Sequence, residues 1–261
     1  MKIQANGINI HYEIEGPASA PIVTLSHSLA ADLSMWDPQM KVLTEKYRVL
    51  RYDMRGHGGT DVSEGPYSLD GLTVDVQALL EALGIRQTHF IGLSIGGMIA
   101  QLFALRHPDT IRSLVLCDTS SELPREAKVL FEERIRTAKT LGMGAHVEPT
   151  LQRWFTQPFR NTPAADRIRA LIRRTDPRGY IGCSHAIMGL NLTNRLSSIQ
   201  APTLIIVGEE DPGTPVAAAR TIHEKIKDSE LVILKSASHL SNIEQAEAFN
   251  QTVTRFLAEK G

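Results

Sequence analysis

The feature that most constrains the fold is a series of short, almost uniformly apolar runs, each three or four residues long. Runs this short suit β-strands, and runs this apolar suit parallel strands that are buried on both faces of a sheet. The sequence therefore predicts six core strands of this kind. They lie at residues 22–25, 49–52, 90–93, 114–116, 204–207 and 231–234.

Helical patterns occupy most of the intervals between these runs, at residues 69–83, 95–106, 216–226 and 243–257. Repeated alternation of strand and helix is typical of a mostly parallel sheet covered by helices. The N-terminus adds a hairpin, because residues 1–5 and the alternating segment 8–14 flank an Asn6-Gly7 turn. We predict an α/β fold whose mostly parallel, eight-stranded sheet is flanked by helices.

One long segment interrupts the alternation. Residues 120–198 contain no strand-like run, are rich in Arg, Glu and Ala, and carry the aromatic residues Trp154, Phe155 and Phe159. A structureless loop of this length would be unusual, so helices are expected here. The sequence predicts a helical cap at 120–198, inserted after a core strand, and a core formed by 1–119 and 199–261.

Charge and composition indicate a small-molecule partner. The 28 Lys and Arg residues nearly balance the 29 Asp and Glu residues, which gives no reason to expect binding to nucleic acid or to an anionic membrane. The N-terminus has no apolar leader, and no apolar stretch approaches a membrane span, so we expect a cytoplasmic protein. Cys117 and Cys183 match no metal-ligand spacing, and we expect neither a metal nor a cofactor. The oligomeric state is left open.

A candidate nucleophile lies in the segment Gly92-Leu93-Ser94-Ile95-Gly96, between a predicted strand and a predicted helix. The Gly-x-Ser-x-Gly pattern is typical of a sharp turn that presents the serine hydroxyl at a helix N-terminus, with glycines where neighbouring backbones approach. The alternative is a glycine-rich turn with an N-cap serine. The strand before the motif and the helix after it favour a nucleophilic Ser94, which we expect to be exposed.

A serine nucleophile needs a base, and the base needs a carboxylate that fixes its tautomer. Asp211 follows the predicted strand at 204–207, and His239 follows the last predicted strand. This chain order of serine, acid and histidine predicts the catalytic residues Ser94, Asp211 and His239. Asp118, which also follows a core strand, is the main alternative for the acid, and Glu210 is a third.

An oxyanion hole would require two backbone N–H donors. Ile95 supplies the first, because it directly follows the nucleophile at the start of a helix. The second is expected from the loop after the third strand, and we assign it to Leu29. His27 is expected to brace that loop.

Motifs along nearly the whole chain resemble α/β-hydrolases related to 3-oxoadipate enol-lactonases. The motifs are Gly92-Leu-Ser-Ile-Gly96, Arg51-Tyr-Asp-Met-Arg-Gly-His-Gly-Gly-Thr60, Asp37-Pro38, Val207-Gly-Glu-Glu-Asp211, Ser238-His-Leu-Ser-Asn-Ile-Glu244 and Gly179-Tyr-Ile-Gly-Cys183. The resemblance implies an α/β-hydrolase fold with Ser94, Asp211 and His239 in the positions of the family's triad. The chain departs from the family at Met188-Gly189, where enol-lactonases carry an Arg-Asp pair.

These features predict a cofactor-free serine hydrolase that cleaves small carboxylic esters or lactones through an acyl-enzyme intermediate, close to 3-oxoadipate enol-lactonase. A carbon–carbon bond hydrolase or a perhydrolase would use the same triad. A non-catalytic binding protein on the same scaffold is the alternative outside enzymes.

The cap sequence leads to an expectation about the substrate. The segment 184–192, which is expected to face the site, contains no Lys or Arg and predicts an apolar pocket for neutral esters or lactones. An anionic enol-lactone is the main competing substrate, because an arginine could reach the pocket from elsewhere in the cap. The pocket candidates are Trp154, His185, Met188 and Leu240, and the arginines considered are Arg153, Arg160, Arg173 and Arg174.

Overall fold

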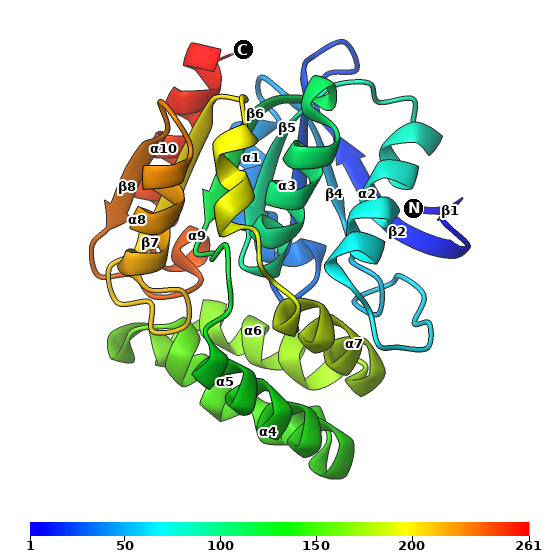
Figure 1. The fold of residues 1–261 in the computed structure, drawn as a ribbon, viewed down its shortest axis with the longest axis vertical. Coiled ribbons are helices and arrows are strands. Elements are labelled where there is room, and N and C mark those ends of the chain that lie inside the picture. The colour runs from blue at the N-terminus through cyan, green and yellow to red at the C-terminus, as the bar shows by residue number, and fades with distance from the viewer. Residues whose placement is uncertain (261) are drawn as a thin grey trace.

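An eight-stranded sheet forms the centre of the computed structural model, which describes residues 1–260 (Figure 1). The strands run in the spatial order β1-β2-β4-β3-β5-β6-β7-β8. The pairs β1/β2 and β2/β4 are antiparallel, and all other neighbours are parallel, which confirms the predicted sheet. The strands are β1 Lys2–Ala5, β2 Ile8–Glu15, β3 Ile22–Ser26, β4 Arg48–Tyr52, β5 Thr88–Leu93, β6 Ile111–Cys117, β7 Thr203–Gly208 and β8 Glu230–Leu234.

The N-terminal hairpin has the predicted turn. Ala5 pairs with Ile8, and the two turn residues Asn6 and Gly7 have φ values of 46° and 74°. Positive φ at both central residues is the requirement of a tight hairpin turn, which asparagine and glycine meet at low cost.

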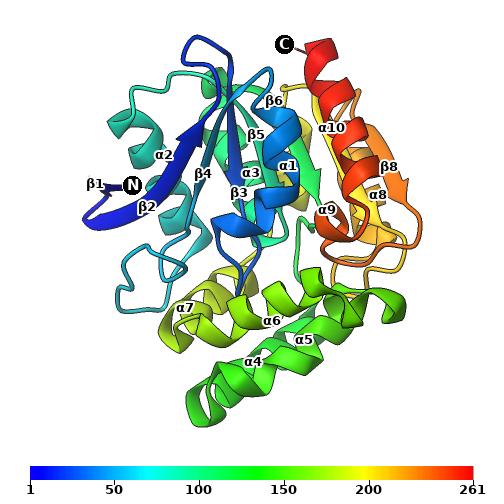
Figure 2. The same cartoon turned by 180° about the vertical axis from the view of Figure 1, so that it is seen from behind.

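Helices cover both faces of the sheet. α2 (Leu69–Ala82), α3 (Ile95–Arg106) and α8 (Val216–Lys225) lie on the face seen in Figure 1, and α1 (Asp37–Leu43) and α10 (Ala246–Lys260) lie on the face seen in Figure 2. The sequence patterns anticipated α2, α3 and α8 but missed α1, which is too short to show a helical period.

Two further expectations were wrong. The predicted single helix at 243–257 is divided, because Gln245 leaves helical geometry with ψ 50° between α9 (Ser241–Glu244) and α10. The strand β8 is only partly buried, whereas β5 and β7 are buried at every position. β8 is the edge of the sheet and therefore has a sheet neighbour on one side only.

A helical cap is inserted between β6 and β7, as the sequence predicts (Figure 1). Its helices are α4 (Arg125–Leu141), α5 (Val147–Trp154), α6 (Pro163–Arg174) and α7 (Pro177–Met188). It covers the end of the sheet at which the parallel strands finish, where ligands bind in open α/β folds. Short 3₁₀ turns occupy Leu33–Trp36, Pro108–Thr110, Met143–His146, Gln157–Asn161 and Thr193–Ser198. Within residues 1–260, every helix is too short or too polar to cross a bilayer.

Candidate active site

A strained strand-to-helix turn places Ser94 between β5 and α3. Ser94 has φ 57° and ψ −119°, a conformation that costs a non-glycine residue on the order of 1–3 kcal/mol. A Cβ atom on Gly92 would lie 2.2 Å from the Gly96 carbonyl oxygen, and one on Gly96 would lie 2.2 Å from that of Ser26. The glycines of the motif are therefore required by backbone approach on both sides of the serine.

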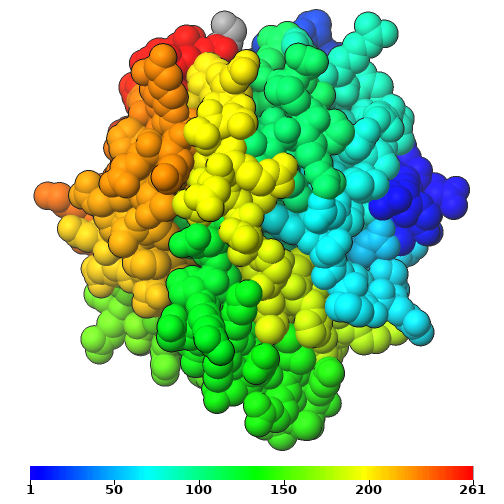
Figure 3. All heavy atoms as spheres, viewed as in Figure 1, coloured from blue at the N-terminus to red at the C-terminus, as the bar shows by residue number. Residues whose placement is uncertain are grey.

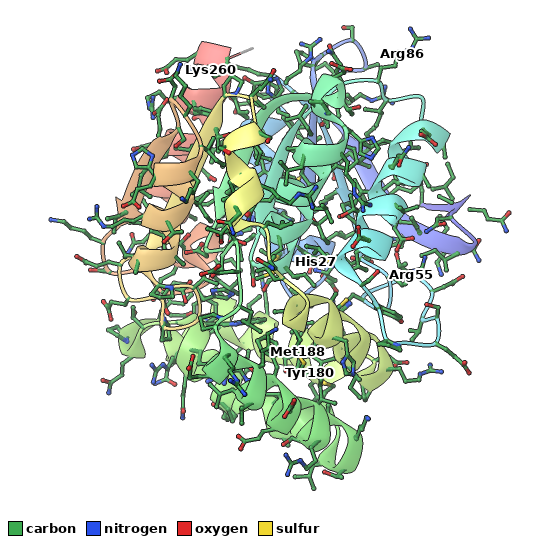
Figure 4. The ribbon with its side chains drawn as sticks, in the orientation of Figure 1. His27, Arg55, Arg86, Tyr180, Met188 and Lys260 are labelled. Atoms are coloured by element: carbon green, nitrogen blue, oxygen red, sulfur yellow. The ribbon has the colours of Figure 1, made fainter. Side chains whose placement is uncertain are left out.

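Ser94 is less exposed than the sequence suggests, with a relative exposure of 7%. The cap covers the turn, so the side chain faces a cavity between cap and core rather than bulk solvent. This cavity has a volume of about 600 Å³, and Ser94 and His239 both line it. Figure 4 shows the same region, with His27 at the end of the sheet and Tyr180 of α7 in the cap below it.

The loops after β7 and β8 bring an aspartate and a histidine together. His239 Nδ1 lies 2.7 Å from Asp211 Oδ2. The other oxygen of Asp211 accepts from the backbone N–H groups of Gly213 and Thr214, and the Thr214 hydroxyl donates to Oδ2. These contacts hold the carboxylate in one orientation and direct the His239 Nε2 edge away from it.

The surroundings of this buried pair favour a protonated His239 and an ionised Asp211. Burial alone would lower the pKa of His239, but the charge of Asp211 and their hydrogen bond raise it above its usual value. Burial would likewise raise the pKa of Asp211, but the charge of His239 and the hydrogen bonds from His239 and Thr214 lower it. Asp211 therefore favours a proton on His239, which is the state that follows proton abstraction.

Asp118 serves different partners. Its Oδ1 accepts from the Gly208 N–H at 2.8 Å, and its Oδ2 accepts from the Ser241 hydroxyl at 2.6 Å. Burial, with a further contribution from the Asp211 charge, raises the pKa of Asp118 well above its usual range. Asp118 thus joins β6 to the loops that carry Asp211 and His239. The third candidate, Glu210, is exposed, and its backbone carbonyl accepts from Ser238.

Ser94 Oγ and His239 share the cavity without a direct hydrogen bond between them in the part of the chain that the structure describes. A catalytic hydrogen bond is often long in a ligand-free site and shortens when substrate binds. Trp154 of α5 lies against the histidine, with its ring centroid 6.0 Å from that of His239. The bulky indole limits the positions that the imidazole adopts.

The loop after β3 is braced by two buried histidines. His27 Nε2 accepts from the Met54 N–H, so its Nδ1 carries the proton that Ser28 O accepts at 2.7 Å. The same peptide unit carries the Leu29 N–H, which points the opposite way because the bond is trans. His57 Nε2 accepts from the Ala30 N–H, and burial lowers the pKa of His57 to about 3, so its imidazole remains neutral.

The two residues expected to supply oxyanion donors both lie near Ser94. Leu29 lines the cavity together with Ser94. Ile95 is the first residue of α3, where backbone N–H groups lack helical partners and favour negative charge.

The cap contributes two cations to the cavity. Arg134 of α4 and Arg153 of α5 both line it, which contradicts the expectation of a pocket without cationic groups. Burial, together with the neighbouring charge of Arg134, lowers the pKa of Arg153 to about 10. Arg153 donates to the Thr150 hydroxyl, and neither arginine has a carboxylate partner in the chain up to residue 260.

The predicted pocket residues are only partly correct. Trp154 lines the cavity, whereas His185, Met188 and Leu240 do not. On α7 the cavity is lined by Tyr180 and Ile187, which are seven residues apart and share one helical face. His185 and Met188 lie on other faces of that helix, and Leu240 is buried against Trp154, whose carbonyl accepts its N–H.

Three other arginines considered for the pocket lie elsewhere. Arg160 donates to backbone carbonyls of Phe155 and Gln152, Arg174 pairs with Asp32, and Arg173 is exposed. Sequence reasoning missed Arg134, Tyr180 and Thr214. Arg134 had a detectable signal, because Ala127, Phe131 and Arg134 are spaced as one face of a helix.

No group of three or more His, Cys, Asp or Glu side chains within residues 1–260 is arranged to hold a metal ion. The polar and charged side chains that line the cavity include Ser94, His239, Arg134 and Arg153.

Comparisons with known proteins agree with this geometry. A family profile described as alpha/beta hydrolase fold matches residues 21–246. The 3-oxoadipate enol-lactonase 2 of Acinetobacter baylyi is 34% identical over 253 residues, which cover 96% of this chain and 94% of that protein. A putative carbamate hydrolase of Stutzerimonas stutzeri is 30% identical, with 96% and 97% coverage.

The fold is also similar to a solved structure. The enol-lactonase from Burkholderia xenovorans LB400 superposes with a TM-score of 0.95 at 38% sequence identity, covering 99% of this chain and 100% of that chain. The similarity spans the cap as well as the sheet.

The contacts of Asp118 generate a prediction about stability. The folded state keeps the Asp118 proton that the unfolded chain releases above pH ~4, so this residue destabilises the wild type as the pH rises. Asp118→Asn removes that titration. Urea unfolding at pH 5 and pH 7 should show the variant gaining stability relative to the wild type by up to about 1.4 kcal/mol per pH unit.

Activity supplies the control for this prediction. Asp118→Asn should retain turnover to within about tenfold, because the carboxylate does not contact His239. A loss of about 10⁴ without a change in stability would instead assign Asp118 the role of the acid.

Proposed function

Because the chain belongs to the α/β-hydrolase fold family, we propose that it hydrolyses small carboxylic esters or lactones through a triad of Ser94, His239 and Asp211. The observation that carries the proposal is the strained turn at Ser94, which directs its side chain into the cavity lined by His239. A serine held only for structural reasons would not need a conformation that is unfavourable for every residue except glycine.

Acylation begins when Ser94 Oγ attacks the substrate carbonyl carbon and His239 Nε2 takes the hydroxyl proton. Asp211 stabilises the resulting imidazolium through Nδ1. The N–H groups of Leu29 and Ile95 donate to the carbonyl oxygen as it becomes negative. His239 then protonates the departing oxygen, and an acyl-enzyme remains.

Deacylation repeats these steps with water as the nucleophile. His239 takes a proton from water, the hydroxide attacks the acyl carbon, and Ser94 Oγ leaves with the proton returned by His239. In a lactone the departing oxygen remains attached to the acyl chain, so one open-chain acid is released. The triad and the donors account for the complete cycle without a further reagent.

We also infer that the preferred substrate carries a carboxylate. Arg153 is a partly buried cation without a counter-charge among residues 1–260, and a second cation, Arg134, lies beside it. Two adjacent guanidinium groups repel each other, and a bound carboxylate would relieve this repulsion and accept their hydrogen bonds. The name of one relative, 3-oxoadipate enol-lactonase, supports the proposal, because oxoadipate has two carboxylates and its lactone retains one of them. This replaces the neutral substrate expected from the cap sequence.

Removal of the nucleophile tests the proposed reaction. Ser94→Ala should lower turnover of a 4-nitrophenyl ester by about 10⁶ while the fold is retained, because only the hydroxyl is lost. Circular dichroism and thermal unfolding check the fold. The wild type should also be labelled by a fluorophosphonate, and the variant should not. Turnover near the wild-type rate in this variant would disprove the nucleophile assignment.

The pH profile tests the histidine and its partner. The base acts when neutral, so kcat/KM should rise with pH through the raised pKa of His239. In Asp211→Asn the burial of His239 is no longer opposed by a carboxylate, so the acidic limb should move to lower pH. The maximal rate should fall by about 10⁴, because the tautomer of His239 is no longer fixed. An unchanged acidic limb would count against the pair.

The role of Arg153 is tested by paired substrates. For the wild type, kcat/KM for an ester with a terminal carboxylate should exceed that of its neutral analogue at least about tenfold, or about 1.4 kcal/mol. Arg153→Met should remove this preference and leave the neutral ester little affected. Arg173→Met, an exposed cap arginine, is the matched control and should behave like the wild type. Equal rates for both substrates in the wild type would exclude a carboxylate site.

A further inference from the structure

The residues that line the cavity around Ser94 form two groups that differ in chemistry. One group, Arg134, Arg153 and Tyr180, comes from the cap helices and marks the cationic direction. The other lies between the start of α4 and the start of α8, and we call it the apolar branch. It is lined by Leu123, Ala127, Leu130, Pro215, Ala217 and Ala218.

The apolar branch opens at the surface between cap and core. Leu130 is 51% exposed, although α4 is otherwise rich in charged residues. A single exposed leucine is ordinary, but Leu130 continues the face of Ala127 and the wall of the cavity that holds Ser94. Figure 3 shows α4 in green below the orange and gold atoms of α8 and its preceding loop.

Small side chains keep this branch open. Ala217, Ala218 and Thr221 occupy the part of α8 that lines the cavity, and Ala127 lines it from α4. The polar groups at this end are few. Glu122 accepts from Thr193, and the described lining of the branch contains no cationic side chain. A charged substituent would therefore lose hydration here without gaining a partner, whereas hydrocarbon would lose only its contact with water.

The size of the cavity indicates a substrate that is larger than a small lactone ring. A volume of about 600 Å³ lies within the range of about 300–1,000 Å³ that holds drug-sized ligands. A five-membered lactone with one short carboxylate arm would occupy the catalytic centre and the cationic direction. It would leave the apolar branch filled only by water.

We propose that the apolar branch is a subsite for an unbranched hydrocarbon chain of the substrate. The inference rests on the proposed function, because the chain must extend from the carbonyl group that Ser94 attacks. The enzyme then accepts esters or lactones that join an alkyl chain to the reacting group, with a carboxylate bound separately at Arg134 and Arg153.

Chain length is the direct test. Two series are measured, 4-nitrophenyl esters from acetate to octanoate and n-alkyl acetates from ethyl to octyl, each rate divided by that of spontaneous alkaline hydrolysis. Each CH₂ group that is moved fully out of water strengthens binding about fourfold. Because the branch is half open, we expect kcat/KM to increase about twofold or more for each added CH₂ group. The slope should appear in at least one series, because the chain is in either the acyl or the alcohol part.

Variants at the branch connect the slope to its location. Ala218→Phe should abolish the chain-length slope, because the ring would fill the branch. Leu130→Glu alters an exposed side chain, so it should fold, and it should selectively slow the long esters. Arg220→Phe, on α8 but outside the lining, is the control that should keep the slope.

The outcomes separate the two proposals. If the wild type hydrolyses none of the esters, the proposed function fails. If it hydrolyses every chain length with the same normalised kcat/KM, or if Ala218→Phe and Leu130→Glu keep the full slope, the apolar branch is not a hydrocarbon subsite. A slope that both variants remove, and that Arg220→Phe retains, supports it.

Discussion

Close backbone approach at the turn between β5 and α3 is the constraint on which the site depends. Gly92 and Gly96 allow the chain to reverse from strand to helix within one residue, and Gly96 lies directly against the end of β3. The same contact places the Ser26 and His27 carbonyl groups, at the end of β3, against the start of α3. Because the strand ends are packed this tightly, the backbone on both sides of Ser94 is held in place. The strain at Ser94 is therefore maintained by the packing of three strands around it, with β6 accepting the Ser94 N–H through Cys117.

Two neighbouring carboxylates illustrate how environment separates roles that the sequence leaves open. Asp118 and Asp211 both follow core strands, and both are buried. Asp211 is surrounded by donors and by a histidine, which stabilise its charge. Asp118 has one backbone N–H and one hydroxyl as partners, so burial and the nearby negative charge favour its protonated form. Of the two carboxylates, Asp211 is therefore the one whose negative charge is stabilised beside a histidine.

The cap determines which molecules reach this machinery. It covers Ser94, brings two arginines to one side of the cavity and leaves an apolar opening on the other side, next to α8. None of these features changes the bond-breaking steps. In the function proposed above, a substrate has a reacting carbonyl group, an anionic group and a hydrocarbon part, and a different wall of the cavity binds each of them. Under this proposal the strand ends carry catalysis and the inserted helices carry specificity.

The sequence was sufficient to derive the strands and three of the core helices, because both produce local apolar patterns. It also predicted the order of Ser94, Asp211 and His239, because turn glycines mark the serine and because ligands bind where parallel strands end. The short helix α1, the break at Gln245 and the cavity-facing side of α7 could not be derived in this way. These depend on contacts between segments far apart in the chain, for which no local pattern exists. The same holds for Arg134 and Arg153. The sequence shows that the cap is rich in arginine. Only the packing of α4 and α5 decides which guanidinium groups are partly buried in the cavity and which lie in solvent.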